Sequence, residues 1–258
     1  MVAFERFGMS EQTAGTSPEQ IRSLLTQNLA KVEESIVAAC QAAGRPRSEV
    51  ELVAVSKMHP TAAIAEAVEL GLRLFGESRV QEFAAKSAEL NAEIRGKMRV
   101  HLIGHLQSNK AAKAVELFDG VDSLDSLKLA ERLNEAAASR SKRLPVLLEI
   151  KLSHEETKAG LAPDSVELAE LLERLPSLPY LDAQGLMTIA PLDVSEDQTR
   201  ACFRELRDLR DRLSAKHPRL NLPVLSMGMS GDFPLAIAEG ATRIRVGTAL
   251  FGAREYPQ

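Results

Sequence analysis

Lys57 ends a short apolar segment and is the residue best placed for covalent chemistry. The segment Leu52-Val53-Ala54-Val55-Ser56 precedes it, and the turn Met58-His59-Pro60 follows it. Because side chains alternate along a strand, we expect Lys57 to share a face with Val53 and Val55, on the core side. Burial favours the neutral amine of a lysine, which can then attack a carbonyl. The alternative is a strand-end lysine whose ammonium group reaches water along its methylene stem.

Two glycine-containing segments near the C-terminus have the composition of phosphate-binding loops. The first runs over residues 226–232, Ser-Met-Gly-Met-Ser-Gly-Asp, and the second begins with Gly247-Thr248. Glycine lets a main-chain amide approach an anion closely, and the amides that open a helix point outward together. Turns of this composition often only connect elements. Together with Lys57, however, the two segments indicate a site that holds a phosphorylated aldehyde at both ends.

Arg245 lies in the segment 243–246, in which arginine alternates with an apolar residue. On a strand it shares a face with Arg243 and Gly247. A buried guanidinium without an acceptor is costly, so Arg245 needs a partner. Two interpretations remain open: an ion pair between strands with a carboxylate such as Glu77, or a hydrogen-bond donor to the ring nitrogen of a ligand.

The elements that must position these residues alternate along the chain between short apolar runs and longer amphipathic segments. Eight such units in one chain favour a parallel, closed (β/α)8 TIM barrel, an α/β fold, over a doubly wound open sheet. The open sheet would normally carry a glycine fingerprint after its first strand, where this chain has Ser56-Lys57-Met58. The expected strands are 51–56, 72–75, 99–103, 120–123, 145–151, 182–188, 223–226 and 243–246. The expected helices are 61–70, 80–90, 107–118, 126–139, 165–175, 196–216 and 233–238.

An additional helix is expected before the barrel. Ser17-Pro18-Glu19-Gln20 has the pattern of a capped helix start, and apolar residues then recur at helical spacing until near Gly44. Residues 1–16 are polar and aperiodic, and we expect them to form a flexible N-terminal extension. Residues 17–258 then form a single barrel domain.

The overall composition excludes several classes of protein. The 258 residues are 45% hydrophobic and 26% charged, with a formal net charge of -4 and no basic run. We therefore expect no nucleic acid partner and no membrane contact, and no segment has the length of a membrane span. Cys40 and Cys202 are far apart and fall in helical patterns, as expected for buried thiols of a cytoplasmic protein.

Several motifs together are similar to those of a known family. They are AVSK at 54–57, FGESRVQE at 75–82, HLIGHLQSNK at 101–110, GLMTIAP at 185–191 and LSMGMSGDFPLAIAEGATRIRVGTALFG at 225–252. In order and without large gaps, from about residue 18 to 256, the chain resembles the pyridoxal phosphate homeostasis protein family. The resemblance implies a barrel like that of alanine racemase and pyridoxal 5′-phosphate (PLP) bound to Lys57 as an internal aldimine.

The resemblance also implies roles for other residues of the site. It assigns the phosphate group to Met229, Ser230, Gly247 and Thr248, with Ser226 nearby, and the ring nitrogen to Arg245. The family usually has Asn after FGE, whereas this chain has Ser78. The shorter hydroxyl side chain puts the role of that position in doubt.

His101 and His105 show a spacing that would suit a metal site on a helix. Residues 100–103 have the pattern of a strand, however, and four strand residues span roughly 13 Å, too far for a shared ion. We therefore expect no metal. We expect His101 to be a hydrogen-bonded interior group, and His105, just past the strand end, to lie near the cofactor.

Two functions are compatible with these residues. The resemblance implies a PLP carrier that takes part in intracellular vitamin B6 and amino-acid homeostasis with little or no catalysis. We expect this carrier to be a monomer that could supply PLP-dependent apo-enzymes. The alternative is a PLP-dependent amino-acid racemase or decarboxylase. An arginine at the ring nitrogen weakens the electron sink that such an enzyme needs. A racemase would also need a second base, and neither Tyr180 nor Tyr256 is expected to supply it, nor is a second domain expected after the barrel.

Overall fold

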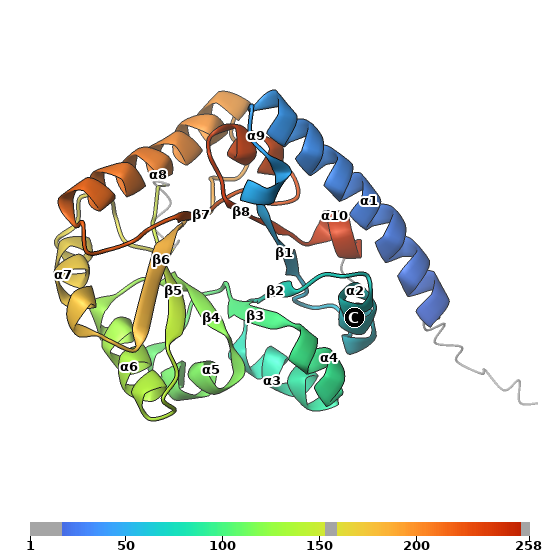
Figure 1. Ribbon diagram of the computed structural model, residues 1–258, viewed down its shortest axis with the longest axis horizontal. Coiled ribbons are helices and arrows are strands. Elements are labelled where there is room, and N and C mark those ends of the chain that lie inside the picture. Colours follow the sequence, from blue (N-terminus) through green and yellow to red (C-terminus); the bar gives the residue numbers. More distant parts are fainter. Residues whose placement is uncertain (1–16, 153–158, 254–258) are drawn as a thin grey trace, which may run out of the picture.

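The computed structural model describes residues 17–152 and 159–253, and these form a closed parallel barrel with strand order β1 to β8 (Figure 1). The predicted (β/α)8 fold is thereby confirmed. The expected flexible extension, residues 1–16, lies outside the described residues. The strands are β1 (Glu51–Val55), β2 (Leu74–Glu77), β3 (Arg99–Leu102), β4 (Gly120–Leu124), β5 (Leu144–Glu149), β6 (Leu181–Met187), β7 (Val224–Ser226) and β8 (Arg243–Val246).

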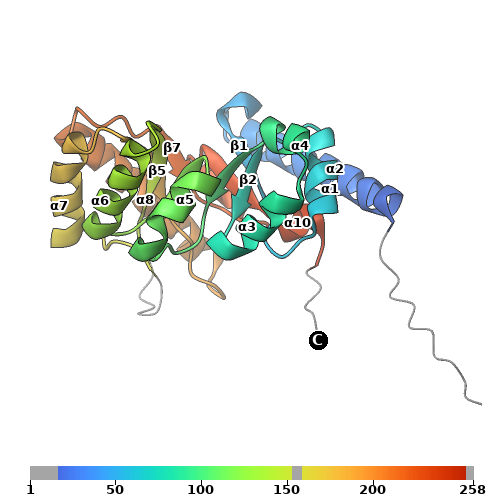
Figure 2. The ribbon, with the colours of Figure 1, turned by 90° about the horizontal axis from the view of Figure 1, so that it is seen from below.

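Helices surround the barrel on its outer side (Figures 1 and 2). They are α1 (Pro18–Ala42), α2 (Thr61–Glu69), α3 (Val80–Glu89), α4 (Ala92–Lys97), α5 (Ala111–Leu117), α6 (Leu127–Ala138), α7 (Val166–Arg174), α8 (Glu196–Lys216), α9 (Phe233–Ala238) and α10 (Thr248–Phe251), with short 3-10 turns at Arg47–Glu49, Ser108–Lys110 and Leu175–Ser177. The predicted N-terminal helix is confirmed. It begins with a capping box between Ser17 and Gln20 and packs against α2, α9 and α10. No helix within residues 17–152 and 159–253 is long and apolar enough to cross a bilayer.

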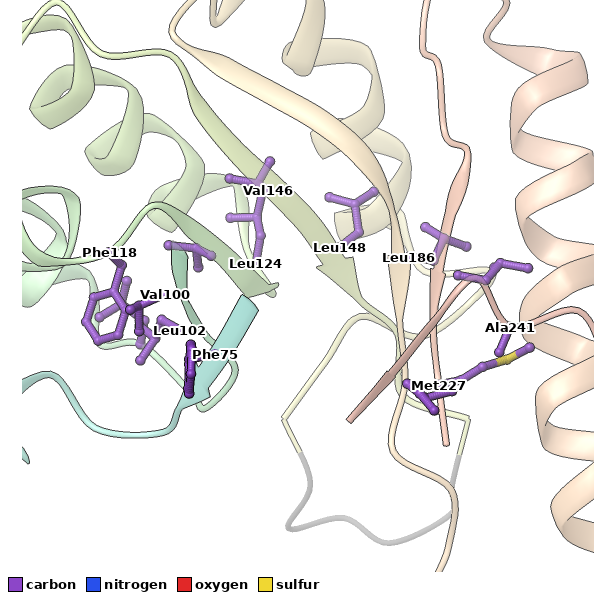
Figure 3. Close-up of a cluster of buried hydrophobic side chains, with 14 of the residues drawn as sticks. Phe75, Val100, Leu102, Phe118, Leu124, Val146, Leu148, Leu186, Met227 and Ala241 are labelled. Carbon is purple, nitrogen blue, oxygen red and sulfur yellow. The ribbon is translucent and has the colours of Figure 1, made fainter. Parts of the chain in front are cut away.

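The main hydrophobic core lies between the outer face of the strands and the helices. Alternate strand residues contribute to it, among them Leu52 and Ala54 of β1 and Val146 and Leu148 of β5. Figure 3 shows part of this cluster, with Leu124, Val146 and Leu148 on neighbouring strands. The intervening residues of each strand point into the barrel, so the side-chain period places Arg243 and Arg245 of β8 inside.

The interior of the barrel contains charged groups as well as apolar ones. A small separate cluster consists of Val53, Val55 and Leu74, with Ile103 packed against it. Among the charged groups, His101 Nδ1 lies 2.7 Å from Asp122 Oδ1, and Arg243 lies 3.4 Å from the same carboxylate and 2.8 Å from Glu51. Burial opposes the ionisation of Asp122, but the neighbouring His101 and Arg243 outweigh it and lower the pKa of Asp122. The expectation that His101 is a hydrogen-bonded interior group is confirmed.

Most element boundaries differ from the sequence prediction by one or two residues, and strand β2 and the connection before β3 differ more clearly. Strand β2 covers Leu74–Glu77, whereas the prediction was 72–75. Glu77 is part of the strand and is fully buried. Its Oε1 accepts hydrogen bonds from Lys86 Nζ at 2.9 Å and from Ser56 Oγ at 2.7 Å. A search for runs of apolar residues does not find a buried carboxylate that is paired with a lysine, so the prediction ended the strand before Glu77. The connection before β3 also contains the additional helix α4. Cys40 and Cys202 are buried on helices and form no disulfide, as expected.

Candidate functional site

Lys57 lies in the turn that follows β1, at the C-terminal end of the barrel. Strand β1 ends at Val55, one residue before the end of the expected strand 51–56, and Lys57 is half-buried in the turn. The turn is closed by the His59 amide, which donates to the Ser56 carbonyl at 3.0 Å. Met58 adopts a φ of 63°, a conformation that is uncommon for a residue with a side chain. The position of Lys57 is therefore set by a tightly bent segment.

A buried ionic network holds this turn from outside the barrel. Lys86 Nζ donates to the Ser56 carbonyl and to Glu77 Oε1, both at 2.9 Å, and lies 2.7 Å from Glu82. Glu82 in turn accepts a hydrogen bond from the Met58 amide. Burial raises the pKa of Glu77, although Lys86 opposes the shift; at Glu82 the effect of Lys86 and Met58 outweighs burial and lowers the pKa. The residues on both sides of Lys57 are thus fixed to α3.

Arg245 points into the barrel and is 4% exposed. Its Nη1 donates to Ser226 Oγ at 2.9 Å and its Nη2 donates to the Thr188 carbonyl at 2.8 Å. The ion pair with Glu77 that one interpretation proposed is wrong, because Glu77 bonds Lys86 on the outer face of β2. Burial lowers the pKa of Arg245. A guanidinium carries more donors than these two contacts use, so the side chain is held in place with donors left for a ligand.

The two glycine-containing loops meet at Ser230. Its Oγ accepts hydrogen bonds from the Gly247 amide at 3.2 Å and from the Ala249 amide at 3.3 Å. The first loop is fixed in turn by the Arg245 amide, which donates to the Gly228 carbonyl at 3.0 Å. Gly228 has a φ of 89°, and a Cβ there would lie 2.6 Å from Ala236 Cβ, so this position requires glycine. Amides and hydroxyls from two distant segments therefore face the same place.

The second loop also adjoins β1. A Cβ added to Gly247 would lie 3.4 Å from both Val55 Cβ and the Val55 carbonyl, two residues before Lys57. The residues selected from the sequence thus gather at the C-terminal ends of β7, β8 and β1; they are Lys57, Ser226, Met229, Ser230, Arg245, Gly247 and Thr248. An amine, a buried guanidinium and a set of amides and hydroxyls fit an aldehyde, a ring nitrogen and a phosphate group. Ser78 lies after β2, where its carbonyl packs against Gly104.

The opposite side of the same mouth is acidic, which the sequence analysis did not find. Glu149 ends β5 and is 8% exposed, and its Oε2 has no hydrogen-bond partner among the described residues. Burial and then the nearby Asp125 raise the pKa of Glu149 to about 7, against the opposing effect of Arg245 and His105. His105 Nδ1 lies 2.8 Å from Asp125 Oδ2. The one available signal was an acid at the end of an otherwise apolar run.

No arrangement of three or more His, Cys, Asp or Glu side chains in the described ranges could hold a metal ion. His101 and His105 each pair with their own aspartate, Asp122 and Asp125. The mouth of the barrel has basic and amide groups on one side and carboxyl groups on the other.

Comparisons with known proteins identify the family of the chain. The family profile described as alanine racemase, N-terminal domain, matches residues 27–255. A pyridoxal phosphate homeostasis protein of Pseudomonas aeruginosa is 44% identical over 234 residues, which cover 91% of this chain and 97% of that protein. The corresponding protein of Escherichia coli is 38% identical over 232 residues, covering 90% of this chain and 97% of that protein.

Solved structures give the same result. PipY of Synechococcus elongatus, whose structure has PLP bound, is 45% identical with a TM-score of 0.75, covering 88% of this chain and 100% of that one. An alanine racemase of Clostridium difficile shares the fold at 16% identity, with a TM-score of 0.68 over 92% of this chain and 58% of that one. On these similarities, which extend over nearly its whole length, the chain belongs to the pyridoxal phosphate homeostasis protein family.

Proposed function

We propose that this protein holds PLP covalently, as a Schiff base on Lys57, and takes part in intracellular PLP and amino-acid homeostasis. The observation that carries the proposal is the convergence of Lys57, Arg245 and the Ser230-linked loops at one end of the barrel. The PLP bound in the similar PipY structure supports the choice of ligand.

Each part of the cofactor has a matching group in this proposal. Lys57 supplies the amine for the aldehyde, and its turn is fixed by the Lys86 network. Ser226, Met229, Ser230, Gly247 and Thr248 supply hydroxyls and amides for the phosphate group. The Gly247 amide donates to Ser230 Oγ and the Met229 amide donates to Asp232 Oδ1 in this structure, so a phosphate group bound by these amides replaces those two hydrogen bonds. Arg245, held by Ser226 and Thr188, donates to the ring nitrogen. A permanently cationic donor keeps that nitrogen unprotonated, so the bound cofactor is a weak electron sink.

The weak electron sink is the reason for proposing a carrier and not a racemase or decarboxylase. Tyr180 supports this choice, because it precedes β6 and so lies at the N-terminal end of the barrel, away from Lys57. Tyr256 lies outside the described residues. We propose that the protein acts as a monomer and that PLP-dependent apo-enzymes are its recipients. Transfer of PLP from the purified protein to an apo-enzyme, followed by recovery of that enzyme's activity, tests the recipient directly.

Covalent attachment is tested by absorbance and peptide mapping. The protein incubated with PLP should show an aldimine band that borohydride removes, and the pyridoxyl group should be found on the peptide containing Lys57. Lys57→Ala should lose the band and keep its fold, since a half-buried turn lysine contributes little packing. Lys113→Ala, on the exposed face of α5, is the matched control and should keep the band. A pyridoxyl group on another lysine would refute the assignment.

The phosphate site is tested by comparing PLP with pyridoxal, which lacks the phosphate group. Pyridoxal should bind far more weakly, because the amides and hydroxyls of the two loops then have no anion to bind. Equal affinities for the two compounds would contradict the phosphate assignment and leave the assignment of Lys57 untouched.

A further inference from the structure

One amide of the two glycine-containing loops is bonded to a carboxylate of the same chain. The Met229 amide donates to Asp232 Oδ1, whereas the Gly247 and Ala249 amides donate to Ser230 Oγ at 3.2 and 3.3 Å. Asp232 is the N-cap residue of α9, a position where an aspartate commonly accepts hydrogen bonds from the amides of its own helix. Its side chain makes no such bond and instead accepts from the loop before the helix. The carboxylate thus holds an amide that the proposed function gives to the phosphate group.

The two acceptors, a hydroxyl and a carboxylate, differ in what they can do beside a phosphate group. Ser230 can release the Gly247 amide to a phosphate oxygen and donate its own O–H to the same group, so it stays in the site as a ligand. An ionised carboxylate has no donor, and its charge repels a phosphate group that approaches the Met229 amide. Asp232 is partly exposed, so water can solvate its carboxylate once it leaves that amide. The phosphate group must therefore displace Asp232, and Asp232 can return to the amide when the phosphate group leaves.

The negative charge of Asp232 also acts at the ring end of the site. Asp232 is one of the carboxylates that oppose the lowering of the pKa of Arg245 by burial. Replacing Asp232 therefore changes the phosphate end through the Met229 amide and the ring end through Arg245. Pyridoxal separates the two effects, because it has the same ring and lacks the phosphate group.

We propose that Asp232 is an internal competitor for the phosphate group, which weakens the binding of PLP and speeds its release. The inference rests on the proposed function, because it takes the Met229 amide as part of the phosphate site. A carrier must give up its ligand. A carboxylate that can replace one phosphate contact lowers the affinity for PLP and leaves Lys57 and Arg245 in place for the rest of the cofactor. The effect of Asp232 is confined to ligands that carry a phosphate group.

The experiment compares Asp232→Asn and Asp232→Ala with the wild type. Asp232→Asn removes the charge and keeps an oxygen acceptor, and Asp232→Ala removes both. Asp208→Asn, which removes a charge from the exposed face of α8, is the matched control. Each apo-protein is titrated with PLP, with pyridoxal and with inorganic phosphate. Release of PLP after dilution is followed by the loss of the aldimine band, and urea unfolding measures the stability of each variant.

We expect both Asp232 variants to bind PLP and inorganic phosphate about 10-fold more tightly than the wild type, because a charged hydrogen bond no longer has to be broken and a like-charge contact is removed. Their release of PLP should be slower, and their affinity for pyridoxal should change much less. Asp208→Asn should behave like the wild type. The tighter binding should not be accompanied by higher stability, since Asp232→Ala loses the hydrogen bond to the Met229 amide.

Weaker binding of PLP and phosphate by the Asp232 variants would overturn the proposal, because it would show that the bond to the Met229 amide holds the loop in the shape that binds the ligand. Unchanged affinity for PLP and phosphate would also overturn it, as would an equal gain for pyridoxal, which would place the effect at Arg245. Asp232→Asn, the smaller change, decides the matter if Asp232→Ala does not fold. Failure of PLP to label Lys57 in the wild type would instead refute the proposed function, and the phosphate titrations would still test the role of Asp232.

Discussion

Replacing Glu149 by Gln should change the pH dependence of stability in a defined direction. The pKa of this carboxyl group is raised from an ordinary 4.5 to about 7 in the folded protein, mainly by burial. Between these pH values the folded state binds more protons than the unfolded state, so the contribution of Glu149 to stability falls as the pH rises. Below about 4.5 both states are protonated, and above about 7 the full cost of a buried carboxylate is present. The side-chain amide of the Glu149→Gln variant stays neutral throughout.

The size of the effect follows from the same values. The difference between the ordinary pKa of 4.5 and the raised pKa of about 7 corresponds to a free energy of unfolding of about 3 kcal/mol, at about 1.4 kcal/mol per pKa unit. Glu149 is 8% exposed, so little of this is lost to solvent screening. Relative to the wild type, Glu149→Gln should therefore gain up to about 3 kcal/mol of stability between pH 5 and pH 8. Contributions from Asp122 and other titrating groups are common to both proteins and cancel in the difference.

Urea unfolding of the apo-proteins at pH 5, 6, 7 and 8 measures this difference, with Glu93→Gln as the control. The free energy of unfolding of Glu149→Gln minus that of the wild type should rise steadily with pH, while the control should show no trend. A difference that is flat from pH 5 to pH 8, or that falls, would refute the reasoning. It would mean that the carboxyl group is compensated in the folded protein and ionises normally.

Three further predictions concern the turn that contains Lys57, the loop that contains Gly228, and proton exchange at the Cα atom of an amino acid. Lys86→Met should destabilise the protein by about 3–5 kcal/mol in urea unfolding, because it leaves Glu77 buried without its cation; Lys97→Met, which removes surface ion pairs, should have little effect. Gly228→Ala should cost about 1–3 kcal/mol or more, since φ is 89° and the new Cβ meets Ala236, whereas Gly231→Ala has open space and should be tolerated. In D2O, the PLP-loaded protein should exchange the Cα proton of L-alanine more slowly than about 1 per second; faster exchange, measured by NMR, would favour the racemase alternative.

The local sequence was sufficient to predict the architecture and to select the residues of one side of the candidate site. The spacing of apolar residues reflects which face of a strand or helix is buried, so each element could be recognised from the sequence. The alternation of strands and helices along the chain then predicted the barrel, and helical spacing before it predicted the N-terminal helix. Lys57 was selected because it follows an apolar strand, and the loops at Ser230 and Gly247 were selected because glycine and hydroxyl residues cluster in the sequence. Each of these signals lies within a few consecutive residues.

The partners of the buried charges were decided only by the tertiary structure. Barrel closure pairs β1 with β8 and sets Val53 beside Arg245, although the two are far apart in the chain. It likewise brings Ser226 and Thr188 to Arg245, Lys86 to Glu77, and Asp125 to Glu149. A periodic pattern records which face of a strand is buried, but not which distant side chain meets it there. For that reason the acidic side of the mouth became visible only when the eight strands were closed.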